Sequence, residues 1–268
     1  MVLNFITWNV NPDIFHLGPL TVRWYGLLFA SGFFFGYLIM AKIFQKENIP
    51  QPILDKLTLY MALGTILGAR LGHCLFYEPA YYLLNPLEIL FIWHGGLASH
   101  GAAIGIILAL YLFAKKTKKP FFWILDRIVI VVALSGFLIR IGNLMNSEIV
   151  GRATDLPWGF IFERDVELKG APRHPTQIYE ALVCLVIFII LLIWYKNNYN
   201  KKVHGFAFSI FLIILFVFRF FVEFIKDVQV NFENNMMFDM GQILSIPFVL
   251  LGIILLFRYY KQLKAKNI

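Results

Sequence analysis

The stretch that decides how this chain folds is Arg140-Ile-Gly-Asn-Leu-Met-Asn-Ser-Glu-Ile-Val-Gly-Arg152. It ends an apolar run that begins near Phe121, so an arginine, two asparagines and a glutamate lie close together where that run ends. A helix that only crosses lipid avoids such groups, because an arginine near the bilayer centre costs roughly 2.5–3.5 kcal/mol on insertion scales. Polar groups persist there when they face a bundle interior or a cavity, so the stretch indicates a functional site. The alternative is that Arg140 extends to the membrane interface while the asparagines cap the helix.

The composition is that of an integral membrane protein. Of the 268 residues, 59% are hydrophobic and only 15% are charged, which is more apolar surface than one soluble core hides. The net charge of +8 does not indicate nucleic-acid binding, because the basic residues lie in short clusters between apolar runs. Cys74 and Cys184 lie inside such runs without metal-ligand spacing, and we expect both to be small core residues.

Seven apolar runs are long enough to cross a bilayer as helices. They cover approximately residues 22–41, 57–77, 89–113, 121–143, 177–195, 205–225 and 241–259. The predicted fold is therefore an all-α membrane protein, a single membrane domain over residues 1–268. Residues 1–20 mix Phe, Ile and Trp with Asn and Pro, so we expect an amphipathic arm that lies on the membrane.

The basic residues predict the orientation of these runs. Fourteen of the twenty-four basic residues lie in alternate connections and at the carboxyl terminus, within residues 42–56, 115–119, 196–202 and 258–266. The opposite connections hold only six, mixed with acids. Basic loops stay in the cytoplasm, so the amino terminus is predicted outside and the carboxyl terminus inside. The one sizeable loop, 147–176, then forms a small extracytoplasmic head with a short strand within 157–163 and a turn at Gly170.

Glycines recur at four-residue intervals in the first three runs. Such glycines allow helices to approach closely within a bilayer, so we expect them at packing contacts. The residues concerned are Gly32 and Gly36, then Gly64, Gly68 and Gly72, then Gly101 and Gly105.

Further polar residues inside the runs are candidates for chemistry. Arg219 and Glu223 lie four residues apart in the sixth run and can neutralise each other, whereas Arg140 has no acid at this spacing and needs a distant partner. Two arginines from different helices that converge on a dry cavity would bind an anion such as phosphate. Tyr25, at the start of the first run, either belongs to the interfacial aromatic belt or donates to that phosphate.

The third run contains His94-Gly-Gly-Leu-Ala-Ser-His100-Gly. His100, near the middle of the run, is the better candidate for a base, because histidine titrates near neutrality. If the segment is helical, His100 lies about 9 Å deeper than His94. The alternative is that His100 is a hydrogen-bonded packing group. No metal-ligand set is visible in the sequence, and we expect neither a metal nor another cofactor.

These motifs resemble those of the bacterial prolipoprotein diacylglyceryl transferase family. The stretch 140–152 and the segment 94–101 carry the resemblance, and the supporting motifs follow in the family's order over nearly the whole chain. These are Trp24-Tyr-Gly26, Gly68-Ala-Arg-Leu-Gly72, Arg173-His-Pro-Thr-Gln-Ile-Tyr-Glu180, Phe218-Arg-x-x-x-Glu223 and Met240-Gly-Gln-Ile-Leu-Ser245. The resemblance implies seven spans, an outside amino terminus and an extracytoplasmic head.

The resemblance also implies a reaction in the bacterial inner membrane. The diacylglyceryl group of phosphatidylglycerol would pass to the lipobox cysteine of a prolipoprotein, with formation of a thioether and release of glycerol phosphate. His100 would be the base for the thiol, while Arg140 and Arg219 would bind the phosphate. The other residues implied at the headgroup site are Tyr25, Arg70, Asn143, Asn146, Glu148, Gly151 and Glu223.

Two other classes of function use the same residues. A transporter or channel for an anionic lipid or solute would also need buried arginines, but the odd number of runs and the lack of a sequence repeat are unfavourable. A non-catalytic assembly factor would not need a histidine together with two arginines.

Overall fold

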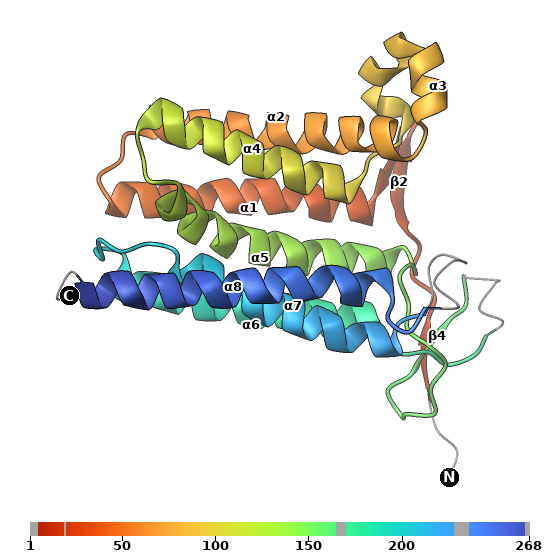
Figure 1. Ribbon diagram of the computed structural model, residues 1–268. Helices are drawn as coiled ribbons and strands as arrows, with labels where there is room; N and C mark the ends of the chain where they lie inside the picture. The colour runs from red at the N-terminus through yellow and green to blue at the C-terminus, as the bar shows by residue number, and fades with distance from the viewer. Residues whose placement is uncertain (1–4, 19, 165–169, 228–235, 266–268) are drawn as a thin grey trace. The chain divides into compact units, whose positions relative to one another are not determined.

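The structure is a computed structural model that describes residues 5–18, 20–164, 170–227 and 236–265 (Figure 1). The chain divides into two compact units. The larger unit consists of Met1–Ile39 and Asp126–Ile268, and the smaller unit of Met40–Leu125.

Within the described ranges, six helices are long and apolar enough to cross a membrane. They are α1 (Trp24–Lys46), α2 (Gln51–Phe76), α5 (Phe121–Met145), α6 (Thr176–Asn198), α7 (Phe206–Val222) with the 3-10 turn η4 (Glu223–Ile225), and α8 (Met240–Ala265). Each coincides with one of the predicted runs, so the chain is a multi-pass membrane protein.

The third predicted run differs from a single helix over 89–113. The segment before it forms α3 (Pro79–Leu84) and the 3-10 turns η1 (Pro86–Leu90) and η2 (Ile92–His94), and α4 covers only Ser99–Thr117. Gly95 and Gly96 separate η2 from α4 with φ of 88° and 70°, a left-handed conformation that glycine adopts without strain. The prediction of a mid-helix His100 is therefore wrong, because His100 is the second residue of α4.

The smaller unit is built on glycine contacts between α2 and α4, which lie side by side in Figure 1. A Cβ added to Gly68 would lie 2.5 Å from the carbonyl oxygen of Gly101, and one added to Gly72 would lie 2.6 Å from the Cα of Gly101. Both distances are shorter than real Cβ contacts, so no larger residue fits. The predicted packing role of these glycines is confirmed.

The helices of the larger unit also approach each other through small residues. In α1, Gly32 lies against Ser135 of α5, and Gly136 of α5 lies against Cys184 of α6. Helices α6, α7 and α8 pack in sequence order, as Figure 1 shows. Cys74 and Cys184 are both buried and free, as the sequence predicts.

Four short strands among the described residues correct the all-α prediction. They are β1 (Ile6–Trp8), β2 (Asp13–Leu17), β3 (Leu20–Arg23) and β4 (Phe160–Phe162). β2 and β3 form an antiparallel pair, and β1 pairs in parallel with β4, which confirms the strand predicted within 157–163. Gly170, with φ of 69°, lies in the predicted turn.

The strand β1 belongs to a small core outside the long helices. Trp8 packs against a cluster of Leu144, Val150, Phe160 and Phe162, and its indole N–H donates to the carbonyl of Leu144 at 3.0 Å. The predicted amphipathic arm is therefore partly a strand of the head, which we define as β1 together with residues 147–176. A parallel strand partner 154 residues away leaves no local sequence signal.

Candidate active site

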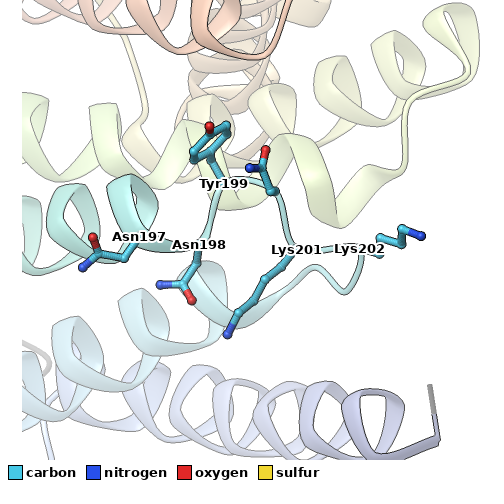
Figure 2. A pocket seen from close by; sticks show the side chains of 6 residues that line it. Asn197, Asn198, Tyr199, Lys201 and Lys202 are labelled. Atoms are coloured by element: carbon cyan, nitrogen blue, oxygen red, sulfur yellow. The ribbon is translucent and has the colours of Figure 1, made fainter. Parts of the chain in front are cut away.

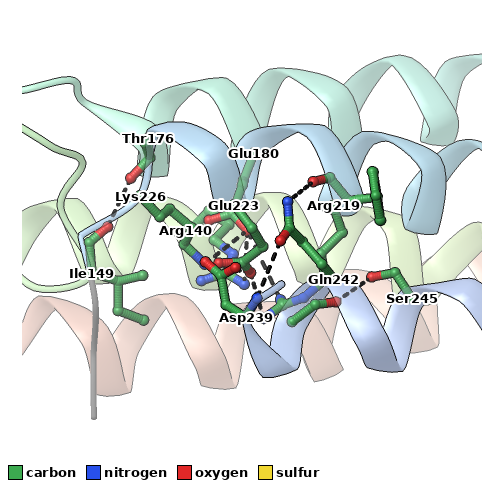
Figure 3. Close-up of polar contacts among 12 residues, drawn as sticks. Arg140, Ile149, Thr176, Glu180, Arg219, Glu223, Lys226, Asp239, Gln242 and Ser245 are labelled. Atoms are coloured by element: carbon green, nitrogen blue, oxygen red, sulfur yellow. Dashed lines mark hydrogen bonds and ion pairs between the residues drawn. The ribbon is translucent and has the colours of Figure 1, made fainter. Parts of the chain in front are cut away.

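A single carboxylate of the larger unit lies close to three cations. Oε1 of Glu180, in α6, lies 3.3 Å from Nη2 of Arg140 in α5 and 4.0 Å from Nη1 of Arg219 in α7 (Figure 3). The Nζ of Lys226, which follows η4, lies 3.6 Å from the same oxygen. The Glu180 side chain is only 7% exposed. The prediction that Arg140 pairs with a distant acid is confirmed.

A second carboxylate completes this cation cluster, which consists of Arg140, Arg219, Lys226, Glu180 and Glu223. Glu223 Oε1 lies 3.1 Å from Nη2 of Arg219, which confirms the predicted pair, and 3.2 Å from Nζ of Lys226. Charged side chains away from water need opposite charges beside them, and the members of this cluster supply these for one another.

The first turn of α8 also packs against Glu223. A Cβ on Gly241 would lie 2.5 Å from Glu223 Oε1, so the second residue of α8 has to be glycine for the carboxylate to keep its place. Gln242 beside it donates to the carbonyl of Phe220 at 3.3 Å and accepts from the N–H of Asp239 at 3.1 Å. These contacts fix the start of α8 against the end of α7 (Figure 3).

The stretch 140–152 continues the network away from the cations. Arg140 Nη1 donates to Asn143 Oδ1 at 3.3 Å, and the Asn143 amide donates to Glu148 Oε1 at 2.7 Å. Asn146 donates to the same oxygen at 3.4 Å. An ionised carboxylate only accepts, so Glu148 determines how both amides are oriented. The structure thus brings together four of the five residues of this stretch that the resemblance implies at the headgroup site.

Backbone strain surrounds Glu148. Ser147 and Ile149 have φ of 57° and 59°, in the left-handed region that a β-branched residue such as isoleucine rarely adopts. Strain of this kind costs on the order of 1–3 kcal/mol for each residue and persists where neighbouring contacts enforce it. Here α6 supplies them, since the Thr176 hydroxyl donates to Ile149 O at 2.9 Å and the Gln177 amide donates to Glu148 O at 2.6 Å.

Two predicted residues contact this stretch or lie within it. A Cβ on Gly142 would lie 2.9 Å from Cδ2 of Tyr25, so the tyrosine ring rests against the helix two residues after Arg140. Gly151 is closely packed against other protein atoms. A Cβ there would lie 2.5 Å from Cβ of His174 and 2.7 Å from the carbonyl of Ile225.

The end of α7 is tied to the head through backbone hydrogen bonds. The N–H of Arg152 donates to Ile225 O at 2.8 Å, and the N–H of Asp227 donates to Val150 O at 3.2 Å. Asp227 also forms an ion pair with Arg173. These contacts bury Lys226 to 2% exposure, although it lies in a short polar connection after the sixth apolar run.

The smaller unit contains the other two predicted residues. Arg70 is buried, and it donates to the carbonyl oxygens of Ile89 at 3.0 Å, of Gly95 at 2.5 Å and of Gly96 at 3.3 Å. Its guanidinium also lies 5.0 Å from the ring centroid of Tyr82. Arg70 therefore fixes the segment that leads into α4, whose second residue, His100, has an exposed side chain.

A separate cavity of about 370 Å³ lies at the opposite end of α6 (Figure 2). Its lining consists of Asn197, Asn198, Tyr199, Asn200, Lys201 and Lys202. Asn198 follows Glu180 by eighteen residues, a distance of about 27 Å along the helix. None of the predicted site residues belongs to this lining, and the cavity is not the candidate site.

Glu180 and Lys226 are members of the site that were not predicted from the sequence. A signal for Glu180 was present, because it lies near the start of an apolar run and has no basic residue three or four positions away. Arg140 likewise lacks an acid at this spacing. Two opposite charges without a local partner, in membrane helices that follow each other in the chain, are expected to pair. Lys226 gave no such signal, since its burial depends on the contacts of the head.

The fold and the site define a multi-pass membrane protein with a cation-rich cluster of charged side chains beside its head. The sequence model for the family "Prolipoprotein diacylglyceryl transferase" matches residues 12–258, and the chain belongs to this family.

Curated relatives agree with this assignment over nearly their whole length. One from Tolumonas auensis is 48% identical over 250 residues, 93% of this chain and 95% of the relative. Relatives from Bacteroides fragilis and Chloroherpeton thalassium are 44% and 45% identical, and each alignment covers 97% or more of both chains. All three carry the name phosphatidylglycerol--prolipoprotein diacylglyceryl transferase.

A histidine beside the site predicts a pH-dependent stability. The Trp158 indole N–H donates to the Tyr179 hydroxyl at 2.9 Å, and that hydroxyl lies 3.3 Å from His174 Nδ1. Burial lowers the pKa of His174 from its ordinary value of 6.5, so folding favours the neutral ring. Stability is therefore complete above pH 6.5 and declines as the pH falls below it.

We expect the thermal unfolding midpoint in detergent micelles to fall between pH 6.5 and 5 because His174 has to take up a proton. His174→Gln cannot be protonated in this range, so its midpoint should fall less over the same interval. Intrinsic fluorescence would follow both proteins, with pH 8 as the reference. Equal declines in the two proteins would show that other groups control the acid sensitivity.

Proposed function

We propose that this chain transfers the diacylglyceryl group of phosphatidylglycerol to the lipobox cysteine of prolipoproteins, the first step of bacterial lipoprotein maturation. Family membership supports the class of reaction. The observation that carries the proposal is the convergence of Arg140 and Arg219 from two helices on one carboxylate oxygen, because this geometry fits one phosphate group. The rival reading as a transporter receives no support, since each relative described above is named as a transferase.

The reaction needs an activated thiol and a stabilised leaving group. The cysteine loses its S–H proton to a base, and the sulfur forms a bond with the glyceryl carbon that carries the phosphate ester. The carbon–oxygen bond to phosphate breaks, and its electron pair leaves with glycerol phosphate. The phosphate changes from a diester with one negative charge to a monoester with more, so cations beside it stabilise the transition state.

The cation cluster suits this role. Arg219 is 36% exposed and Arg140 is 19% exposed, so an anion can reach both, while Lys226 behind them is 3% exposed. A guanidinium donates two parallel hydrogen bonds to a phosphate, and such charge-assisted bonds are about twice as strong as neutral ones. In this proposal, Glu180 and Glu223 hold the cations in place before the substrate arrives.

The surroundings of Arg219 suit a lipid donor. A groove of about 190 Å³ between α7 and α8 is lined only by apolar residues. They are Val217, Phe220, Phe221, Ile246, Val249 and Leu250. In α7, Val217 precedes Arg219 by two positions and Phe220 follows it directly. A lipid with its phosphate at Arg219 would therefore find apolar surface close by for an acyl chain.

His100 is the proposed base, because a thiol with a pKa of ~8.5 is largely protonated at neutral pH. Its exposed side chain in the first turn of α4 is open to a substrate. We assign Tyr25, Asn143, Asn146 and Glu148 to the headgroup site beside Arg140. We assign Arg70 and Gly151 to positioning, because their contacts are with protein backbone and with other side chains.

The membrane topology of the proposal has seven spans in the bacterial inner membrane, with the amino terminus and the head outside. The seventh span is α4, whose nineteen residues reach about 28 Å, close to the thickness of the hydrocarbon core. Its last turn contains Lys115 and Lys116, as expected for a cytoplasmic end. The bilayer, phosphatidylglycerol and the prolipoprotein are the partners that this proposal requires.

Accessibility tags test this topology. Four spans separate the amino terminus from the head if α4 crosses the membrane, so tags at the amino terminus and beside Gly170 should both be labelled from outside. A tag after Lys266 should be labelled only after permeabilisation. Opposite sides for the amino terminus and Gly170 would exclude α4 as a span.

Substitution of Arg140 tests the shared phosphate. The purified protein should add a diacylglyceryl mass to a lipobox peptide when phosphatidylglycerol is present. Arg140→Ala should abolish this transfer, and Arg140→Lys should restore little of it, because a point charge cannot reproduce a bidentate fork. As a matched control, Arg127→Lys changes another buried arginine of α5 outside the cation cluster and should retain most transfer. Near-normal transfer by a folded Arg140→Ala protein would refute the assignment.

Substitution of His100 tests the base. His100→Gln keeps a hydrogen-bonding side chain but cannot accept the proton, so transfer should fall by roughly 100-fold or more. Raising the pH toward 9 should restore part of the rate, because more thiolate forms without a base. His94→Gln is the control and should be much milder. A small loss in His100→Gln, or no gain at higher pH, would make His100 an orienting residue.

A further inference from the structure

Two acceptor oxygens in α6 are buried without a hydrogen-bond partner among the residues that the structure describes. They are Oε1 of Gln177 and Oε2 of Glu180, on side chains that are almost completely buried. The two residues are three positions apart, so they lie on the same face of the helix. Glu180 faces the other members of the cation cluster (Figure 3). Gln177 donates a hydrogen bond to the carbonyl of Glu148.

In each of these two side chains, the other polar atom already has a partner. Oε1 of Glu180 forms the ion pairs with Arg140, Arg219 and Lys226, so Oε2 is the oxygen without a described partner. The Gln177 amide nitrogen donates to Glu148 O at 2.6 Å, which determines the amide orientation and leaves Oε1. Native proteins rarely leave buried acceptors unpaired, since an unpaired acceptor loses its bond to water without replacement. A donor from outside the chain would satisfy both.

The chemistry of the site restricts what that donor can be. A phosphate held by Arg140 and Arg219 brings its alcohol substituent next to Glu180, because the same carboxylate contacts both arginines. A single ammonium group is one donor centre, whereas the two acceptors lie on side chains three positions apart. Two hydroxyl groups on neighbouring carbons supply two separate donors. The headgroup of phosphatidylglycerol carries such a pair.

We propose that Gln177 and Glu180 bind the two hydroxyls of the headgroup glycerol, and so make the site specific for a polyol phosphodiester. This inference rests on the proposed transfer reaction and adds to it the recognition of the glycerol that leaves as glycerol phosphate. The hydroxyls donate to the two unpaired oxygens while the cations hold the phosphate. A donor lipid without hydroxyls leaves both acceptors unpaired, and sites built around such bonds discriminate strongly against the analogue that lacks them.

A pair of matched lipids tests the proposal. Phosphatidylglycerol and phosphatidylpropanol have the same phosphodiester charge and the same reacting carbon, and they differ only in the two hydroxyls. The full-length protein, in micelles of a neutral carrier lipid, would transfer from each to a lipobox peptide, and kcat/KM would be measured for both. We expect the wild-type protein to prefer phosphatidylglycerol by on the order of 100-fold.

Three variants then locate the source of the preference. Glu180→Met should lower the ratio of the two kcat/KM values about 10-fold or more, because a bond to a carboxylate is lost. Gln177→Met removes a neutral acceptor without breaking an ion pair, and should lower the ratio about 5-fold. Glu223→Met is the control, since it removes a carboxylate of the same cluster whose described partners are cations, and its ratio should equal that of the wild type.

The ratio separates the outcomes. A wild-type ratio near one, with transfer from both lipids, would overturn the proposal and indicate that water fills the two acceptors, while the proposed function would stand. No transfer from either lipid by the wild type would instead contradict the proposed function itself. If Glu180→Met transfers from neither lipid, Gln177→Met decides, and a ratio equal to the wild type would reject the acceptor pair.

Discussion

The ion pairs of Glu180 hold together the segments that form the candidate site. One carboxylate oxygen of α6 receives cations from α5, from α7 and from the segment after η4. Removing one partner of a buried pair costs about 3–5 kcal/mol, because the remaining charge is left without compensation. The cluster therefore holds α5, α6, α7 and the segment after η4 together near the head, and it keeps Arg140 and Arg219 beside one carboxylate oxygen.

The packing around the cluster preserves this geometry at some cost in local stability. Gly241 leaves room for Glu223, and Gly142 leaves room for Tyr25. The left-handed residues Ser147 and Ile149 orient the turn of Glu148, and hydrogen bonds from the first two residues of α6 hold that turn. Strain of this kind is found mainly at functional sites, where it helps to hold side chains in a fixed arrangement. The head contributes in the same way by burying Lys226.

Much of this could be predicted from the sequence, and the failures have physical causes. Hydropathy located six membrane helices because a lipid-facing surface has to be continuous, and the spacing of Arg219 and Glu223 predicted their pair because the i, i+4 relation is local. Gly95 and Gly96 interrupt the third run through their left-handed φ values, which hydropathy does not report. The β1–β4 pairing and the burial of Lys226 depend on contacts between distant segments. Glu180 was predictable in principle, as the acid without a local base that complements Arg140.

The most direct test of the central claim is a structure of the protein with a phosphonate analogue of phosphatidylglycerol, in which a carbon replaces the ester oxygen that would leave. The analogue keeps the charge and cannot react. Our account predicts that its phosphonate oxygens lie about 3 Å from guanidinium nitrogens of both Arg140 and Arg219. A phosphonate bound to only one of the two arginines, or bound away from the cation cluster, would contradict it.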